Sequence, residues 1–282
     1  MAIKKKVGLA LGGGGARGVA HLGVLYILEK YAIPIDMIAG TSIGAIVSAM
    51  YAYYQDVSTI SKAFFESQES PEYKALQLEK IAKNARTESR FKYLKGSFAN
   101  YYLHRRMGFL KAEQTESFLK TLFKDIQFDD LKIPLGLVAG NISQAKGVCF
   151  KDGNLLKAVQ ASMSLPMWME PVEIDGDLYV DGIAHDVVPV KALKEMGADI
   201  VIAVDISLHD KPKNIINALD VDQIANSMTV NRSIDLSLES ADIVIRPETK
   251  GLMWYDFDRS PQLIRAGKNA TENMITTINK LL

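Results

Sequence analysis

The sequence predicts a three-layer α/β/α fold with a mostly parallel central sheet. Short runs of consecutive apolar residues are typical of strands buried on both faces, and stretches with helical periodicity alternate with them along the chain. The chain has 282 residues, of which 48% are hydrophobic and 23% charged, which is enough for a large core. No internal repeat or low-complexity linker marks a boundary, so we expect a single domain over residues 1–282.

The first part of the chain supplies two strand–helix units. The apolar run at residues 7–11 predicts a strand, which leads through a glycine-rich loop into a helix over residues 20–31. Pro34 ends this connection. A second strand is expected over residues 35–39, and a second helix over residues 45–54.

Residues 57–111 interrupt this alternation. The segment is helical in pattern, charged and aromatic, with no convincing strand, so we expect a helical, cap-like insertion. Its aromatic residues are interleaved with basic ones: Phe91, Tyr93, Phe98, Tyr101, Tyr102 and Phe109 with Lys92, Lys95, Arg105, Arg106 and Lys111. This mixture is typical of a membrane-facing surface, and also of an ordinary helical layer with a solvated basic rim. Peripheral membrane contact through residues 91–111 is therefore one of two expectations.

The alternation resumes after this insertion. A hairpin is expected where Asp175, Gly176 and Asp177 separate two short strands, because an Asp-Gly pair favours tight turns. Residues 260–282 carry an apolar stripe with helical spacing, and we expect this stripe to pack on the sheet. Strands are expected over residues 134–139, 147–151, 170–174, 178–180, 200–204 and 242–245, and helices over residues 155–161 and 260–282.

Charge balance and cysteine content exclude several classes of protein. Thirty-three basic residues balance thirty-three acidic ones, which argues against a protein that binds nucleic acid through bulk charge. The one cysteine, Cys149, allows no intramolecular disulfide and suits a reducing compartment. Lys4, Lys5 and Lys6 resemble the start of a signal peptide, but the apolar stretch that follows is too short for one. We therefore expect a cytoplasmic protein, free or peripheral to the membrane, with no metal, cofactor or nucleic-acid partner.

The pentapeptide Gly40-Thr41-Ser42-Ile43-Gly44 has the G-x-S-x-G pattern of a nucleophile elbow. It lies between a predicted strand and a predicted helix, a sharp turn that holds a serine clear of the backbone. The helix N-terminus stands behind that serine. Flanking glycines let chain and substrate approach closely. Ser42 is therefore the expected nucleophile.

A serine nucleophile also needs hydrogen-bond donors for the oxyanion that forms. Four successive glycines, Gly12, Gly13, Gly14 and Gly15, follow the first strand and open a helix. Such glycines can turn their amides the same way and form an anion-binding nest. Arg17 either braces this loop and adds positive potential or is an ordinary surface arginine.

The same loop also fits a dinucleotide-binding fingerprint. Gly13, Gly15 and Gly18 form G-x-G-x-x-G after a strand. The ribose-binding acid of that motif belongs at the end of the second strand, whereas Asp36 precedes this strand and Ser42 follows it. Nucleotide binding is therefore the weaker interpretation.

The base that would activate the serine is harder to identify. Only His185 and His209 come late enough for a serine–acid–histidine order, and neither stands in a glycine-rich loop after a clear strand. Asp181 follows an apolar run and precedes Gly182, which puts a carboxylate at a strand end. An Asp-Gly pair is more often a simple turn, and the local pattern alone favours that interpretation.

Taken together, these motifs resemble the patatin-like phospholipase family, particularly its bacterial members. Residues 13–18 match the family's glycine-rich oxyanion motif, residues 40–44 its nucleophile motif, and Asp181-Gly182 its Asp-Gly motif, in the same order. Residues 161–166 are similar to its Ala-Ser-x-x-x-Pro stretch. The likeness covers most of the chain.

The resemblance implies a patatin-like fold and a serine acyl hydrolase that acts on lipid or other carboxylic esters through a Ser-Asp dyad. By it, Ser42 attacks the acyl carbonyl, Asp181 takes the proton, the amides of residues 12–15 hold the oxyanion, and water releases the acyl-enzyme. The chain departs from the family where Ile183 replaces the usual Gly or Ala, since a β-branched residue disfavours a positive φ. A catalytically weak scaffold that binds lipid or a protein partner is the alternative.

Overall fold

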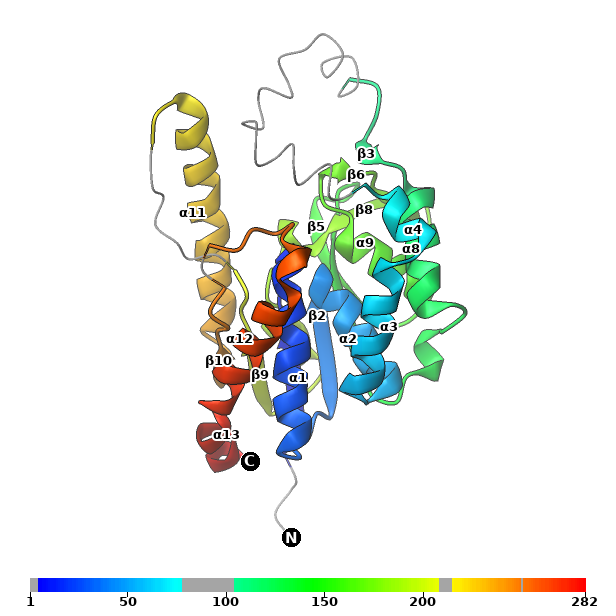
Figure 1. Ribbon diagram of the computed structural model, residues 1–282. Helices are drawn as coiled ribbons and strands as arrows, with labels where there is room; N and C mark the ends of the chain where they lie inside the picture. The colour runs from blue at the N-terminus through cyan, green and yellow to red at the C-terminus, as the bar shows by residue number, and fades with distance from the viewer. Residues whose placement is uncertain (1–4, 78–103, 208–214, 250) are drawn as a thin grey trace.

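The computed structural model describes residues 5–77, 104–207, 215–249 and 251–282. The strands of its central sheet are β1 (Val7–Leu11), β2 (Met37–Thr41), β4 (Leu135–Asn141), β5 (Lys146–Phe150), β7 (Val172–Ile174), β8 (Asp177–Asp181), β9 (Ile200–Val204) and β10 (Ile243–Ile245). Their order is β10-β9-β1-β2-β4-β8-β7, and β5 also pairs with β4 (Figure 1). The strands from β10 to β4 are parallel, whereas β5 and β8 run antiparallel to β4. The sheet is therefore mostly parallel, as predicted.

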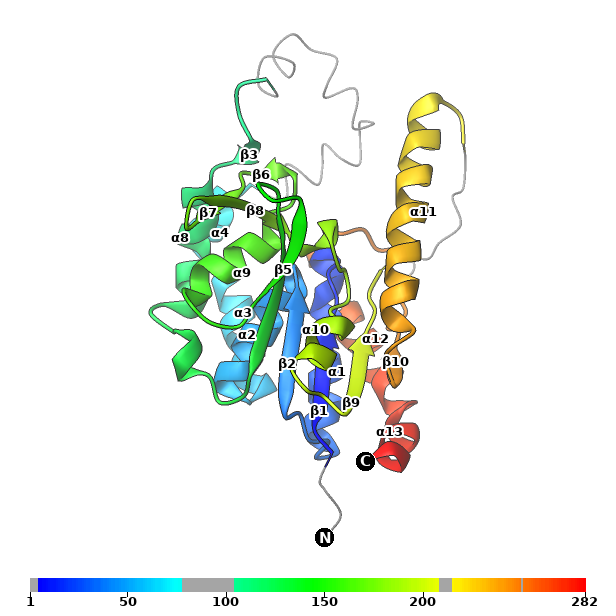
Figure 2. The ribbon, with the colours of Figure 1, turned by 180° about the vertical axis from the view of Figure 1, so that it is seen from behind.

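Helices cover both faces of this sheet (Figures 1 and 2). One layer contains α1 (Ala20–Lys30), α2 (Ile43–Tyr54), α3 (Val57–Gln68), α4 (Pro71–Ala75), α8 (Ala112–Phe123), α9 (Leu155–Met163), α12 (Ser260–Glu272) and α13 (Ile275–Leu281). The other contains α10 (Val190–Glu195) and the C-terminal part of α11 (Ala218–Leu238). The predicted three-layer α/β/α fold is confirmed.

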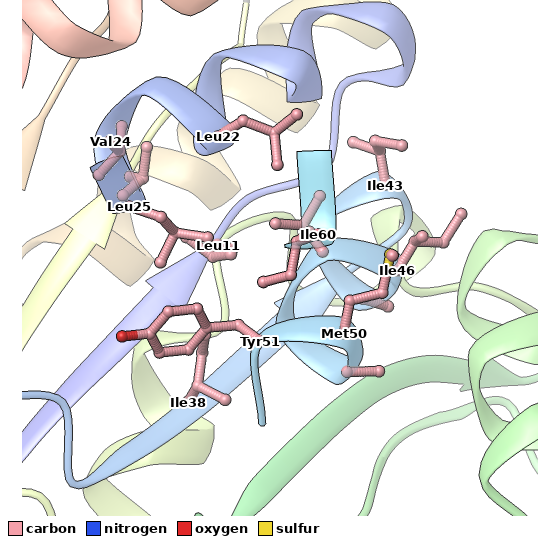
Figure 3. Close-up of a cluster of buried hydrophobic side chains, with 14 of the residues drawn as sticks. Leu11, Leu22, Val24, Leu25, Ile38, Ile43, Ile46, Met50, Tyr51 and Ile60 are labelled. Atoms are coloured by element: carbon pink, nitrogen blue, oxygen red, sulfur yellow. The ribbon is translucent and has the colours of Figure 1, made fainter. Parts of the chain in front are cut away.

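The larger hydrophobic core lies between the sheet and the first of these layers. Leu11 of β1 and Ile38 of β2 meet Leu22 of α1 and Met50 of α2 there (Figure 3). Because side chains alternate along a strand, the neighbouring positions point to the opposite face. That face is lined by the small side chains Ala10, Ala39 and Ala203. It packs against α10 and the end of α11, so the sheet is buried on both sides.

Several element boundaries differ from the predictions. β2 begins at Met37 rather than at residue 35, because Asp36 turns back and its carboxylate accepts a 2.8 Å hydrogen bond from the amide of Val7. Residues 260–282 form two helices rather than one. The predicted hairpin is confirmed: β7 and β8 pair across Asp175 and Gly176, whose φ values of 52° and 84° suit a type I′ turn.

The insertion at residues 57–111 contains a strand, so the prediction that it has none is wrong. β3 (Gly108–Leu110) pairs in parallel with β6 (Met167–Met169), a partner almost sixty residues away in the chain. Residues 78–103, with most of the interleaved aromatic and basic side chains, lie outside the described residues. The cap-like role of the insertion therefore stays a prediction. Within the described ranges, no helix combines the length and apolar character needed to cross a bilayer.

Candidate active site

Two strands meet end to end along one edge of β4. On that edge Thr41, the last residue of β2, lies opposite Val138, and Asp181, the last residue of β8, lies opposite Ala139. The other edge of β4 pairs with β5 throughout this stretch. Since Val138 and Ala139 are consecutive, the ends of β2 and β8 are forced together, and Ser42 emerges beside Asp181.

Ser42 occupies the sharp turn between β2 and α2. Its backbone has φ 59° and ψ −123°, a region that residues other than glycine rarely adopt. The turn is tight: a Cβ at Gly44 would lie 2.1 Å from the carbonyl oxygen of Leu11, and one at Gly40 would lie 2.3 Å from that of Gly44. Close packing of β1 against the start of α2 therefore requires these two glycines and holds the strained serine in place.

The Ser42 side chain donates a 2.7 Å hydrogen bond from Oγ to Oδ2 of Asp181. Its backbone amide donates to Oγ of Ser162 at 3.1 Å, and the Ser162 hydroxyl donates to the carbonyl of Val138 at 2.6 Å. Ser162 thus ties the turn to β4. It lies in the stretch 161–166 that the sequence singled out, but its contact with the turn could not be foreseen.

Asp181 is a buried carboxyl group, 1% exposed. Burial raises the pKa of Asp181 to about 7, and hydrogen bonds from the Ile183 amide to Oδ1 and from the Ser42 hydroxyl oppose part of that shift. Ile183 is not among the residues with positive φ, so its β-branched side chain causes no backbone strain. The group therefore titrates near neutral pH, where an exposed aspartate is always ionised.

The glycine loop lies directly against this pair. A Cβ at Gly13 would be 3.2 Å from Cβ of Ser42. The Gly12 and Gly13 amides donate to the carbonyls of Val204 and Val187, at 3.1 and 2.9 Å. Within the described part of the chain, the Gly14 and Gly15 amides make no such bond. Among the described residues, Val204 of β9 and Val187 accept the amides of Gly12 and Gly13, so only Gly14 and Gly15 of the four predicted donors have no backbone acceptor there.

Two further groups shape the loop. Arg17, which sequence alone left as a brace or a surface residue, is 9% exposed and is therefore buried beside the loop. Its Nε lies 3.4 Å from where a Cβ at Gly14 would be. At Gly15 the chain turns with φ 59°, and the next amide, that of Ala16, donates to the carbonyl of Trp254 at 2.6 Å.

His21 is a buried group that the sequence analysis did not select. Its side chain is fully buried, and Nε2 lies 2.8 Å from the carbonyl oxygen of Gly12. Burial lowers the pKa of His21 to about 4, so the ring is neutral at pH 7 and Nε2 donates its hydrogen to that carbonyl. His21 thereby fixes the first peptide of the glycine loop. Its position at the start of the helix after the loop is the only sequence signal for this contact.

Other sequence candidates lie away from this pair. Asp36 bonds to β1 at the amino end of the strands, opposite to the glycine loop, which removes the ribose-binding acid from the dinucleotide interpretation. The His185 ring packs over Gly147 of β5, where a Cβ would come within 1.8 Å of it. His209 lies outside the described residues. Those residues contain no group of three or more His, Cys, Asp or Glu side chains able to hold a metal ion.

Comparisons with a family model and with curated proteins indicate the same family. The family described as patatin-like phospholipase matches residues 9–194. The chain is 34% identical over 209 residues to Lysophospholipase NTE1 of Pyricularia oryzae, an alignment that covers 73% of this chain and 12% of that protein. It is 32% identical over 210 residues to patatin-like phospholipase domain-containing protein 6 of Mus musculus, covering 73% and 14%. The aligned part thus spans only about an eighth of the length of these curated relatives.

Among solved structures, VipD of Legionella pneumophila superposes with a TM-score of 0.53 and 15% sequence identity. The superposition covers 99% of this chain and 67% of the VipD chain. At this identity the likeness concerns the fold alone, and it agrees with the layered α/β arrangement of Figure 1.

Proposed function

This chain belongs to the patatin-like phospholipase family, and from that premise we propose that it is a serine acyl hydrolase whose nucleophile is Ser42 and whose general base is Asp181. The observation that carries the proposal is the 2.7 Å hydrogen bond from Ser42 Oγ to the buried carboxylate of Asp181. The substrate class is a lipid or another carboxylic ester. The names of the curated relatives, which include a lysophospholipase, support this class.

The proposed reaction has two halves. In the first, the Asp181 carboxylate takes the Ser42 proton while Oγ attacks the acyl carbon, and the carbonyl oxygen becomes an oxyanion. Collapse of this intermediate expels the alcohol, which receives the proton from Asp181, and leaves an acyl ester on Ser42. In the second half, Asp181 takes a proton from water as the water attacks that ester. The acid leaves, and the proton returns to Ser42 Oγ.

Burial supplies the basicity that an aspartate lacks in water. A general base acts best when its pKa lies near the working pH, and the pKa of Asp181 is raised to about 7. The 2.7 Å contact holds the base within the distance needed for direct proton transfer. A histidine intermediary is then unnecessary, which is consistent with the packing of the His185 ring over Gly147 of β5.

The oxyanion would be held by the Gly14 and Gly15 amides. Both lie in the loop that touches Ser42, and their hydrogens are not used elsewhere among the described residues. Backbone donors that are fixed before the reaction stabilise the developing charge without reorganisation. The buried guanidinium of Arg17 beside Gly14 adds positive potential to the same loop.

The proposal is tested by labelling and turnover. A fluorophosphonate probe should modify Ser42, and the protein should hydrolyse a panel of p-nitrophenyl esters and lysophospholipids. Ser42→Ala should lose both activities, whereas Ser58→Ala, which alters an exposed serine of α3, should retain them. Labelling or hydrolysis that survives in Ser42→Ala would rule out this nucleophile. Binding of acyl ligands without labelling or turnover in the wild type would favour the scaffold alternative.

A further inference from the structure

Three aromatic rings from distant parts of the chain form a continuous row, which we call the aromatic rim: Phe109, Trp168 and Trp254. The ring centroids of Phe109 and Trp168 are 5.7 Å apart, and those of Trp168 and Trp254 are 5.8 Å apart. Phe109 lies in β3 and Trp168 in β6, which pair with each other. All three side chains are only partly buried, so the row is open to solvent.

The aromatic rim borders the Ser42–Asp181 pair on two sides. The carbonyl of Trp254 accepts the 2.6 Å hydrogen bond from Ala16, at the end of the glycine loop. On the other side, the amide of Asp181 donates at 2.9 Å to the carbonyl of Ser164, three residues before β6 begins. Figure 1 shows β3 and β6 at the end of the molecule toward which the arrow of β2 points. The rim therefore stands at the carboxyl ends of the parallel strands, beside the proposed nucleophile.

Each of the three rim aromatics also has an exposed methionine close to it in the chain. Met107, Met167 and Met253 are 61%, 42% and 40% exposed, and each is one or two residues from a rim aromatic. Scattered apolar side chains are normal on a protein surface, but exposed apolar side chains gathered next to one row of rings beside a site are typical of an interaction surface. Long, flexible methionine side chains suit a soft and variable partner.

Cations flank the same surface. Arg105, Arg106 and Lys111 are exposed on either side of β3. Basic side chains close to an anionic bilayer gain attraction to its phosphates, while tryptophan prefers the boundary between headgroups and acyl chains. An aromatic and methionine row with a basic flank therefore matches the layered chemistry of a lipid surface.

We propose that the aromatic rim and its three methionines form a docking face for a lipid surface that carries anionic headgroups. The choice of lipid as the occupant rests on the proposed acyl hydrolase function, whereas the face itself is defined by exposure and chemistry. Docking here would bring the segments next to Ser42 and Asp181 against the bilayer. It would involve residues 104–111 of the insertion, together with β6 and the 253–254 segment that the sequence analysis did not connect with it.

The chain carries its own reporter for this test. It has two tryptophans, and both are in the aromatic rim. Vesicles of phosphatidylcholine with phosphatidylglycerol should shift the tryptophan emission to shorter wavelength, and brominated acyl chains in those vesicles should quench it. Pure phosphatidylcholine vesicles should bind more weakly, because they lack the anionic charge that the basic flank attracts. This readout depends on binding and needs no turnover.

Matched methionine variants locate the contact. The double variant Met107→Gln/Met253→Gln should weaken vesicle binding at least about tenfold, since full burial of one methionine in an apolar phase is worth about ten- to a hundredfold in partition. Met228→Gln is the control: Met228 is 67% exposed on α11, which lies on the opposite side of the molecule from β3 and β6 (Figures 1 and 2). It should bind vesicles like the wild type. Hydrolysis of a short, monomeric ester should be unchanged in both variants.

Three outcomes of the vesicle experiments would overturn the docking face. These are vesicle binding without quenching, quenching that the double variant leaves unchanged, or no binding at all. A rise in the KM for the monomeric ester that matches the loss of vesicle binding would also overturn it, because the rim would then be an acyl-chain subsite. Quenching by vesicles in a protein that hydrolyses no ester would contradict the proposed function while the docking face stands.

Discussion

Replacing Asp181 with asparagine should remove activity and, above neutral pH, stabilise the fold. Burial raises the pKa of Asp181 from 3.8 to about 7 in the folded protein. In the unfolded chain the carboxyl group returns to about 3.9. Between these values the folded protein keeps a proton that the unfolded chain releases. The contribution of Asp181 to stability is therefore complete below pH 4 and is lost as the pH rises through 7.

The size of this effect follows from the two pKa values. At 1.36 kcal/mol per pKa unit, ionised Asp181 lowers the free energy of unfolding by about 4 kcal/mol well above pH 7, and by about 2.5 kcal/mol between pH 5 and pH 8. Asparagine cannot ionise, so the variant lacks this dependence. The variant also alters the hydrogen bonds to Ser42 and Ile183, worth about 0.5–1.5 kcal/mol each, but that change is common to both pH values and cancels.

Urea unfolding of both proteins at pH 5 and pH 8, at equal ionic strength, measures the difference. The stability of Asp181→Asn relative to the wild type should improve by about 2.5 kcal/mol over this interval. Wild-type kcat/KM should rise through an apparent pKa near 7, because the base must be ionised. The kcat of the variant should be about 10²- to 10⁴-fold lower than that of the wild type. A stability difference independent of pH, or near-normal turnover in the variant, would refute the reasoning.

Three further substitutions test the backbone around the site. Ser42→Gly should be more stable than Ser42→Ala by about 1–2 kcal/mol in urea unfolding, because glycine tolerates the φ of 59°. Gly44→Ala should cost more than about 3 kcal/mol or prevent folding, seen as a lost thermal transition, because its Cβ would lie 2.1 Å from the Leu11 oxygen. His21→Leu should cost about 1–3 kcal/mol and lower kcat more than it raises KM, because the Gly12 carbonyl loses its donor. Wild-type kcat in this variant would contradict a positioning role for His21.

Local sequence patterns were sufficient to predict those elements of the fold whose residues are close together in the chain. The strand of β1, the glycine loop and the turn after β2 could all be predicted, because apolar runs and glycine spacing express them directly. The β7–β8 hairpin follows from its Asp-Gly turn for the same reason. In contrast, β3 and β6 have three residues each, too few for a periodic pattern, and they exist because they pair with each other.

The helix α11 was not predicted for a different reason. It spans Ala218–Leu238. Among its described side chains, Ile234 and Leu238 near the C-terminal end are buried, while Val221, Met228 and Leu236 are exposed. Apolar side chains therefore occur on several sides of the helix and give no clean stripe. A helix that packs along only part of its length leaves little periodic signal in the sequence.

The pairing of Ser42 with Asp181 could be predicted from the family resemblance, whereas the local sequence favoured a simple Asp-Gly turn. Its physical cause is long-range, because β2 and β8 share one edge of β4 at consecutive residues. The hydrogen bonds from the Gly12 and Gly13 amides likewise depend on where β9 and Val187 lie. Such facts follow from the assembled sheet, and no window of sequence around either residue contains them.

The same sheet geometry explains how, in the proposed mechanism, a carboxylate does the work of a histidine. An exposed aspartate is a poor base at neutral pH, so the site needs a buried one, and burial destabilises the ionised fold. The turn at Ser42 adds backbone strain on the same edge of β4. Both costs are offset by the packing of β1, β2 and α2 around Leu11, Ile38 and Met50 (Figure 3). Substitutions that relieve either cost should therefore stabilise the protein and reduce its activity, so the most stable variants at these two positions should be the least active.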